Sequence, residues 1–344
     1  MMNKFLDNRN IITVICLAGC LSAMSLTACG EDGQTDEAPV AETIEVIKQE
    51  NSPRIETDTS AIDAANEADT MPEATEDNAD SEDPDTDSED AAVVPGAVES
   101  VSLDPSWTYA DFTKINSGTA KLYRAEGNRK NVVIGVNAGH GTKGGQSVKT
   151  YCHPDKTPKV TGGTTAAGSI KAVAVSGGMS FTDGTKEATV TLQMARILRD
   201  KLLAKGYDVL MLRDDDDVQL DNVARTVIAN NTSSCLISLH WDGDGLDHDK
   251  GCFYISTPGG IRNMEPVASH WEEHHELGDA LIKGLKEEGC KISGKGSMAI
   301  DLTQTSYSTI PSVDIELGNQ SSKHDDATLS KLADGMVAGI ETLY

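Results

Sequence analysis

Apolar residues in the C-terminal two thirds of the chain follow two spacings, one typical of buried strands and one of amphipathic helices. The run 131–137 (NVVIGVN) is rich in β-branched residues and indicates a buried strand. A helix is predicted over 187–205, where apolar residues recur at three- and four-residue spacing and Gly206 can cap the C-terminus. By the same criteria we expect strands at 207–212, 235–239, 251–256 and 313–317, helices at 222–230, 264–289 and 326–343, and a hairpin over 107–125 with its turn at 116–118.

These strands and helices alternate along residues 106–344. Such alternation is typical of an α/β fold, in which a mainly parallel twisted sheet carries helices on both faces. A segment of this length can bury one sizeable core, so we expect a single domain. In sheets of this type ligands bind at the carboxyl ends of the strands, and polar residues placed there are candidates for a functional site.

Four polar residues have this placement. His140 and His240 each follow a predicted strand, Glu187 opens a predicted helix, and Glu316 lies late in the last predicted strand. Two imidazoles and one carboxylate form a ligand set typical of a catalytic zinc, with a fourth position left for water. A further carboxylate is what such a site needs as its proton carrier. If the four side chains converge, the sequence predicts a metal hydrolase.

Two further residues are weaker candidates for the same site. Asp314 has the same strand parity as Glu316, so both are expected to face one polar crevice, where Asp314 would bind substrate. Arg225 either contacts substrate or forms a buried structural ion pair, and the sequence leaves both open.

The segment 141–186 interrupts the alternation of strands and helices. It is rich in Gly, Thr and Ser and is too long for an ordinary connection. Because it joins His140 to Glu187, its two ends are held close together if both bind one metal. We expect a partly structured insert that forms a wall or lid of the site; the alternative is a flap remote from it.

Several other classes of site lack support in the sequence. The chain has no glycine-rich phosphate loop, no nucleotide fingerprint and no basic stripe, so neither nucleotides nor nucleic acids are expected as partners. Ser176 lacks the G-x-S-x-G context of a serine hydrolase. His270 and His274 lie one helical turn apart, but Trp271 stands where H-E-x-x-H metalloproteases need Glu, so we interpret them as part of a partly exposed helix face.

The N-terminus is predicted to be a targeting segment. Lys4 and Arg9 precede an uncharged apolar stretch that ends at Leu26-Thr27-Ala28-Cys29, which resembles the lipobox of bacterial lipoproteins. We expect residues 1–28 to be a signal peptide and Cys29 to be lipidated, which would anchor the protein to the membrane outside the cytoplasm. Cys20 also fits the pattern, but cleavage there would leave an apolar tail; an uncleaved anchor is the other alternative.

Residues 29–105 are expected to form a disordered acidic tether. Residues 30–100 carry 23 Asp and Glu against Lys48 and Arg54, and they contain no aromatic residue. Such a segment cannot bury enough apolar surface to offset its ordering entropy, and its like charges extend it. An acidic interaction tail is the alternative.

The cysteines beyond the tether show no C-x-x-C pair, so a cysteine metal site is not expected. An exported location permits disulfides, but free buried thiols fit equally well and no pairing follows from the sequence. These cysteines are Cys152, Cys235, Cys252 and Cys290.

In the residues of the candidate site, the chain resembles the zinc-dependent N-acetylmuramoyl-L-alanine amidases of the Amidase_3 type. That family has a strand ending in G-H-G, a Glu that opens a helix, R-x-x-x-A-N before a strand ending in S-I-H, and a late P-x-x-x-x-E-x-G segment. The match runs in the family's order from about residue 131 to the C-terminus. The matching residues are Gly139-His140-Gly141, Glu187, Arg225 with Ala229-Asn230, Ser238-Leu239-His240, and Pro311 with Glu316 and Gly318.

This resemblance implies a zinc site made by His140, Glu187 and His240, with Glu316 as the catalytic acid and base. The implied substrate is peptidoglycan, cleaved at the amide between the lactyl group of N-acetylmuramic acid and L-alanine of the stem peptide. The departures are Trp241-Asp242 after the second histidine, the long insert, and Asp314 where the family is usually apolar. These differences bear on which substrates fit the site more than on the metal ligands.

Two other functions remain open from the sequence. One is a zinc peptidase with a similar site that cuts within the stem peptide. The other is a non-catalytic lipoprotein that binds the cell wall.

Overall fold

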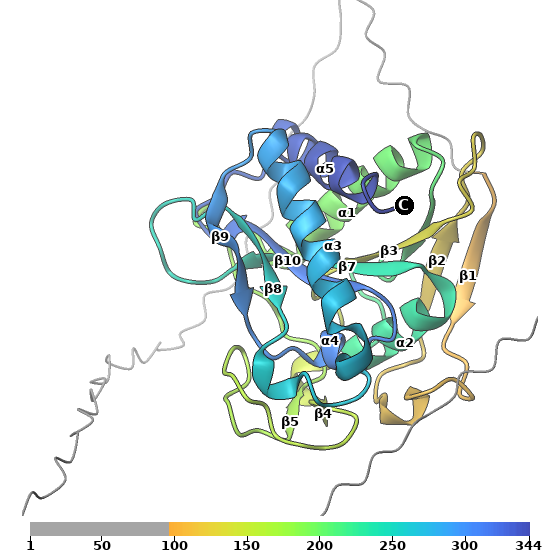
Figure 1. Ribbon diagram of the computed structural model, residues 1–344, viewed down its shortest axis with the longest axis vertical. Helices are drawn as coiled ribbons and strands as arrows, with labels where there is room; N and C mark the ends of the chain where they lie inside the picture. Colours follow the sequence, from red (N-terminus) through yellow and green to blue (C-terminus); the bar gives the residue numbers. More distant parts are fainter. Residues whose placement is uncertain (1–95) are drawn as a thin grey trace, which may run out of the picture. The chain divides into compact units, whose positions relative to one another are not determined.

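A computed structural model describes residues 96–344, which contain one eight-stranded sheet in the order β1-β2-β6-β3-β7-β10-β8-β9 (Figure 1). A separate two-stranded sheet is formed by β4 and β5. The strands of the large sheet are β1 (Val98–Ser102), β2 (Thr119–Tyr123), β3 (Val133–Ala138), β6 (Asp208–Met211), β7 (Cys235–Asp242), β8 (Cys252–Ser256), β9 (Ile292–Ala299) and β10 (Ser312–Asn319), and those of the small sheet are β4 (Lys149–Tyr151) and β5 (Lys171–Val173).

The centre of the large sheet is parallel. Strands β6, β3, β7 and β10 pair in parallel with one another, whereas β2 joins β6 and β8 joins β10 in antiparallel pairs. The central strands read as nearly continuous apolar runs because both faces of the sheet are covered. The predicted α/β class with a mainly parallel sheet is confirmed.

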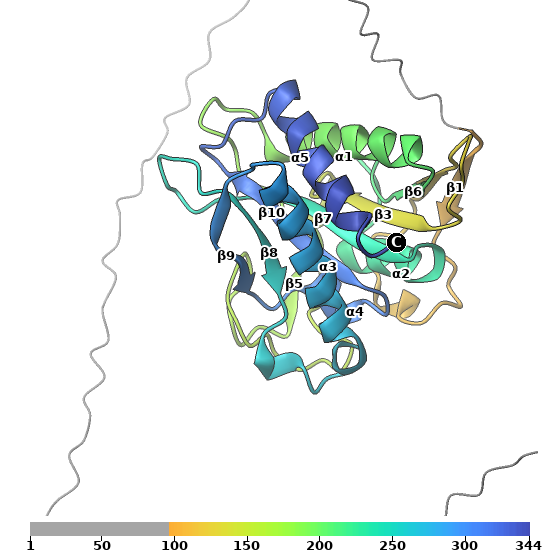
Figure 2. The same cartoon turned by 45° about the horizontal axis from the view of Figure 1, so that its top comes forward.

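Helices cover both faces of this sheet (Figure 2). The main apolar core lies between one face and three helices, α1, α3 and α5, and a second core lies between the other face and α2. Asp221 caps α2 by accepting a hydrogen bond from the Ala224 amide. The helices are α1 (Glu187–Ala204), α2 (Asn222–Thr232), α3 (Val267–Glu287), α4 (Thr303–Tyr307) and α5 (Asp326–Ile340).

The N-terminal part of the folded region differs from the sequence-based prediction. The predicted hairpin over 107–125 is wrong: β2 pairs with β1, which lies at 98–102, and residues 110–112 form a 3-10 turn. The folded region therefore begins before residue 106. The patterns of two short strands do not reveal their partners, because pairing depends on contacts distant in sequence.

Two other elements had no signal in the sequence. β9 is an edge strand with the polar sequence ISGKGSMA, and α4 is a buried helix of five residues without apolar periodicity. Neither shows the spacing by which strands and helices are recognised.

The predicted signal peptide 1–28, the lipidation site Cys29 and residues 29–95 of the tether lie outside the described residues. Within residues 96–344, none of the helices is both long and apolar enough to cross a membrane.

Candidate metal centre and cavity

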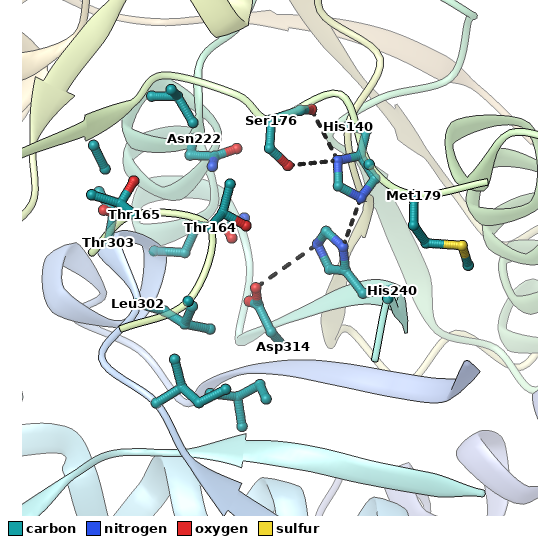
Figure 3. A pocket seen from close by; sticks show the side chains of 18 of the residues that line it. His140, Thr164, Thr165, Ser176, Met179, Asn222, His240, Leu302, Thr303 and Asp314 are labelled. Atoms are coloured by element: carbon teal, nitrogen blue, oxygen red, sulfur yellow. Dashed lines mark hydrogen bonds and ion pairs between the residues drawn. The ribbon is translucent and has the colours of Figure 1, made fainter. Parts of the chain in front are cut away.

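Three side chains predicted to share a site meet at the carboxyl end of the parallel sheet. His140 Nε2 lies 2.8 Å from Glu187 Oε1, and His240 Nδ1 lies 3.1 Å from each of these two atoms. The two imidazole rings are nearly perpendicular, with centroids 4.7 Å apart. Figure 3 shows the rings facing each other at the wall of a cavity. Each residue thus offers one ligand atom toward a common point.

This arrangement fits the donor set of a tetrahedral zinc. Bonds of about 2.0–2.1 Å place neighbouring ligand atoms about 3.3 Å apart, close to the separations found here. Burial by itself would lower the pKa of His240, but its hydrogen bond with Glu187 and the surrounding carboxylates raise that pKa to about 9. The cluster therefore favours a positive charge at its centre, which a divalent cation supplies.

Glu187 is fixed by hydrogen bonds to both of its oxygens. Oε2 accepts a bond of 2.9 Å from the Met179 amide, and Oε1 accepts one of 3.1 Å from the Trp241 amide. Burial would raise the pKa of this carboxyl group, but the close imidazoles of His140 and His240 hold it well below its usual range. Glu187 is therefore ionised, as a ligand to a metal must be.

His140 lies in a sharply turned loop. Its backbone has a φ of 68°, a left-handed conformation that is uncommon for a residue other than glycine. Its Nδ1 lies 2.9 Å from the Ser176 carbonyl, which can only accept, so Nδ1 carries the proton and Nε2 keeps its lone pair. A Cβ at Gly139 would overlap the His240 ring, which explains why glycine precedes this histidine.

Two buried arginines fix the loop that carries His140 by donating hydrogen bonds to its backbone carbonyls. Arg225 donates to the carbonyls of His140 (2.7 Å) and Ala138 (3.2 Å), and Arg213 donates to those of Ala138 and Gly139 (both 3.0 Å). Arg225 is fully buried and is not among the residues that line the cavity, so the structure gives no support to a substrate contact. Asp221 is the acidic residue whose charge acts on the guanidinium, but the two groups make no ion pair within 4.0 Å. The role of Arg225 is to fix backbone carbonyls.

Burial lowers the pKa of the Arg225 guanidinium to about 9, yet the group stays protonated at neutral pH. Arg213 could not be recognised from the sequence, because a single arginine after a strand has no distinctive pattern.

Glu316 and Asp314 both face the cavity from β10, as their shared parity predicts. Asp314 Oδ2 lies 3.8 Å from His240 Nε2. Glu316 Oε2 and Asp314 Oδ1 are buried and have no hydrogen-bond partner in the described part of the chain. Burial raises the pKa of Glu316 to about 8, and neighbouring carboxylates add to the effect. A proton carrier that works near neutral pH needs such a pKa.

The cavity in front of these residues has a volume of about 760 Å³. One wall comes from the insert 141–186, which contains β4 and β5, so the expected partly structured wall is present. In Figure 3 the insert residues Thr164 and Thr165 lie across this space from His240, and Ser176 contacts His140.

The remaining predicted clusters lie away from the cavity. His270 is on the helix surface, but His274 is buried and accepts a hydrogen bond from the Ser312 amide, so only His270 fits the expected exposed face. Burial lowers the pKa of His274 to about 3. In the described region, the thiols of Cys152, Cys235, Cys252 and Cys290 are free.

The fold and this geometry define a class: an α/β protein with a candidate metal site of the hydrolase type at the end of its parallel strands. The chain belongs to the Amidase_3 family of N-acetylmuramoyl-L-alanine amidases, whose pattern matches residues 134–341. The family predicted from the sequence motifs is thereby confirmed, and membership supports amidase activity on peptidoglycan.

A solved structure supports this fold, and others are similar to the chain in sequence. The N-acetylmuramyl-L-alanine amidase Ami1 of Mycobacterium smegmatis is 18% identical, with a TM-score of 0.52 over 62% of this chain and 96% of its own. Ami1 of Mycobacterium abscessus (20% identity, TM-score 0.48) and the CwlD amidase of Clostridioides difficile, solved with the GerS lipoprotein (19%, 0.45), each match over 62% of this chain and 98% of their own. Among curated protein sequences, none matches this chain.

Proposed function

We propose that this protein is a zinc-dependent amidase that cleaves peptidoglycan between the lactyl group of N-acetylmuramic acid and L-alanine of the stem peptide. The observation that carries the proposal is the convergence of His140, Glu187 and His240 at the cavity wall, with Glu316 beside them. Family membership supports the substrate and the bond.

His140 Nε2, Glu187 Oε1 and His240 Nδ1 would hold the metal. When bound, zinc supplies Lewis-acid polarisation of the scissile carbonyl and makes the attacking water more acidic. Ser176 keeps His140 in the tautomer that presents Nε2, and the amides of Met179 and Trp241 orient the Glu187 carboxylate. The ligands are therefore preorganised by the chain itself.

Glu316 is the proposed proton carrier. It would take a proton from the attacking water and return it to the amine of L-alanine as the amide bond breaks. Its raised pKa supports both transfers, because the group can be protonated and deprotonated near neutral pH.

Asp314 is a proposed substrate contact on the other side of His240. Its side chain lines the cavity, where a substrate hydroxyl or amide could donate to the carboxylate.

We further propose an extracytoplasmic location, with the protein anchored to the membrane through lipidated Cys29 and the acidic segment as a tether. The support is the sequence alone. Mass analysis of the mature N-terminus tests it, since a lipid-modified Cys29 is expected.

The function is tested by digesting purified peptidoglycan with the zinc-loaded protein and analysing the products by mass. An amidase releases intact stem peptides with a free L-alanine amine and leaves glycan strands without peptides. Shorter peptides would indicate a peptidase instead. No released product, despite bound zinc, would indicate a wall-binding protein. The Glu316→Gln variant is the matched control for contaminating activity.

A further inference from the structure

Lys159 stands out among the residues that line the cavity. It is the only lysine or arginine among the described lining residues, which otherwise include two histidines and the carboxylates of Glu187, Asp242, Asp314 and Glu316. It belongs to the insert, and it is only 7% exposed. Burying a lysine costs free energy, so an interaction at this position must compensate for it.

The lysine is held in place by a buried anchor centred on Asp301. The Asp301 carboxylate lies 2.9 Å from His153 Nε2 and accepts a bond of 2.8 Å from the Val160 amide. The Asp301 amide donates to Thr161 Oγ1 at 2.7 Å. These contacts fix the backbone after Lys159, and its own amide and carbonyl bond to Ser169 and Gly168, so its position is defined by the fold.

The ammonium group of Lys159 is only partly engaged by this anchor. It donates to the backbone carbonyl of Asp301, whereas the carboxylate of Asp301 bonds to His153 and Val160. In the described chain, no carboxylate lies within 4.0 Å of the ammonium, which has three donor hydrogens. Lys159 is thus a nearly buried lysine in the cavity wall that makes no ion pair within 4.0 Å, although its charge acts on the carboxylates of Asp301 and Asp314.

We propose that Lys159 binds a carboxylate of the stem peptide and makes the site selective for acidic peptides. This inference rests on the proposed amidase function. Lys159 is the only lysine or arginine among the described lining residues, so it is the position where an entering carboxylate gains a charge-assisted hydrogen bond without displacing a ligand of the proposed metal. The insert would then set which stem peptides fit.

The experiment compares soluble muramoyl peptides that differ only in which carboxylate of the stem is converted to an amide. The variants are Lys159→Met, which removes the ammonium, and Lys159→Arg, which keeps a positive charge. Lys143→Met is the matched control, since Lys143 lies in the same insert, is 87% exposed at its side chain and does not line the cavity.

For the wild type, amidating one particular carboxylate should lower kcat/KM by about 10- to 100-fold, mainly through KM. In Lys159→Met, kcat/KM for the acidic substrate should fall by a similar factor. For the substrate with that carboxylate amidated, kcat/KM should stay almost unchanged. Lys159→Arg should retain part of the preference, and Lys143→Met all of it.

Equal losses on acidic and amidated substrates in Lys159→Met would overturn the inference, because they indicate a structural role in holding the insert. Unchanged activity on every substrate would overturn it as well. If the wild type cleaves none of the peptides or peptidoglycan, the proposed amidase function fails first, and this inference fails with it.

Discussion

His240 and Glu316 lie directly opposite each other on the neighbouring parallel strands β7 and β10. Residues in register on adjacent strands point to the same face of the sheet, so one proposed ligand and the proposed proton carrier are fixed relative to each other by backbone hydrogen bonds. Sites built on strands are held more accurately than sites on loops. This pair is therefore the rigid part of the site, and the His140 loop and the insert complete it.

The first prediction concerns metal binding. The His140→Ala, His240→Ala double variant should lose tight zinc binding, because only one ligand of three remains. The wild type should bind about one zinc per chain, and saturating zinc at 100 times the Kd should stabilise it by about 2.7 kcal/mol. Metal analysis and thermal unfolding with and without a chelator measure both. His270→Ala is the control, since this histidine lies on the helix surface. Full zinc occupancy in the double variant would refute the ligand assignment.

The second prediction separates metal binding from chemistry. Glu316→Gln preserves the shape of the side chain but removes its basicity. It should keep normal zinc content and lose about 100-fold or more in kcat. The comparison with Asp314→Asn is informative, because that variant should affect KM more than kcat. Near-normal turnover in Glu316→Gln would mean that another group carries the proton.

The third prediction concerns the close approach of the two histidines. Gly139→Ala places a methyl group against the His240 ring, so the ring must shift and the metal site should be distorted. We expect zinc affinity to fall by about 10-fold or more, because displaced ligands lose their orientation. Gly127→Ala is the matched control, since a Cβ there meets no atom within 4 Å. Unchanged zinc affinity in Gly139→Ala would contradict the geometry.

The fourth prediction concerns the pH dependence of stability. Burial would raise the pKa of Asp301, but hydrogen bonds with His153 and Val160 outweigh this and lower it. A lowered folded pKa means that the stabilisation is present above the unfolded pKa of about 3.9 and is lost as the pH falls through the folded value. Asp301→Asn should therefore cost about 2–3 kcal/mol at pH 7, and the difference from wild type should shrink below about pH 4.

Denaturant unfolding at pH 7 and at pH 3 measures this effect, with Asp247→Asn as the control because its side chain is fully exposed. A destabilisation by Asp301→Asn that is the same at both pH values would show that the charge of Asp301 is not the stabilising feature.

The sequence by itself determined the elements that have a strong local period and the residues at their ends. Apolar runs and helical spacing are set by neighbours along the chain, so the central strands, the main helices, and the placement of His140, Glu187, His240 and Glu316 could be predicted. Their order along the chain also sufficed to indicate the family.

The tertiary structure alone decided which distant segments meet. The pairing of β1 with β2, the polar edge strand β9, and the position of Arg225 beneath the His140 loop depend on partners far away in sequence. The contact of His153 with Asp301 spans 148 residues, and Lys159, which donates to the Asp301 carbonyl, lies in the cavity wall. No local pattern encodes such contacts, because the free energy that selects them comes from burial and hydrogen bonding in the assembled core.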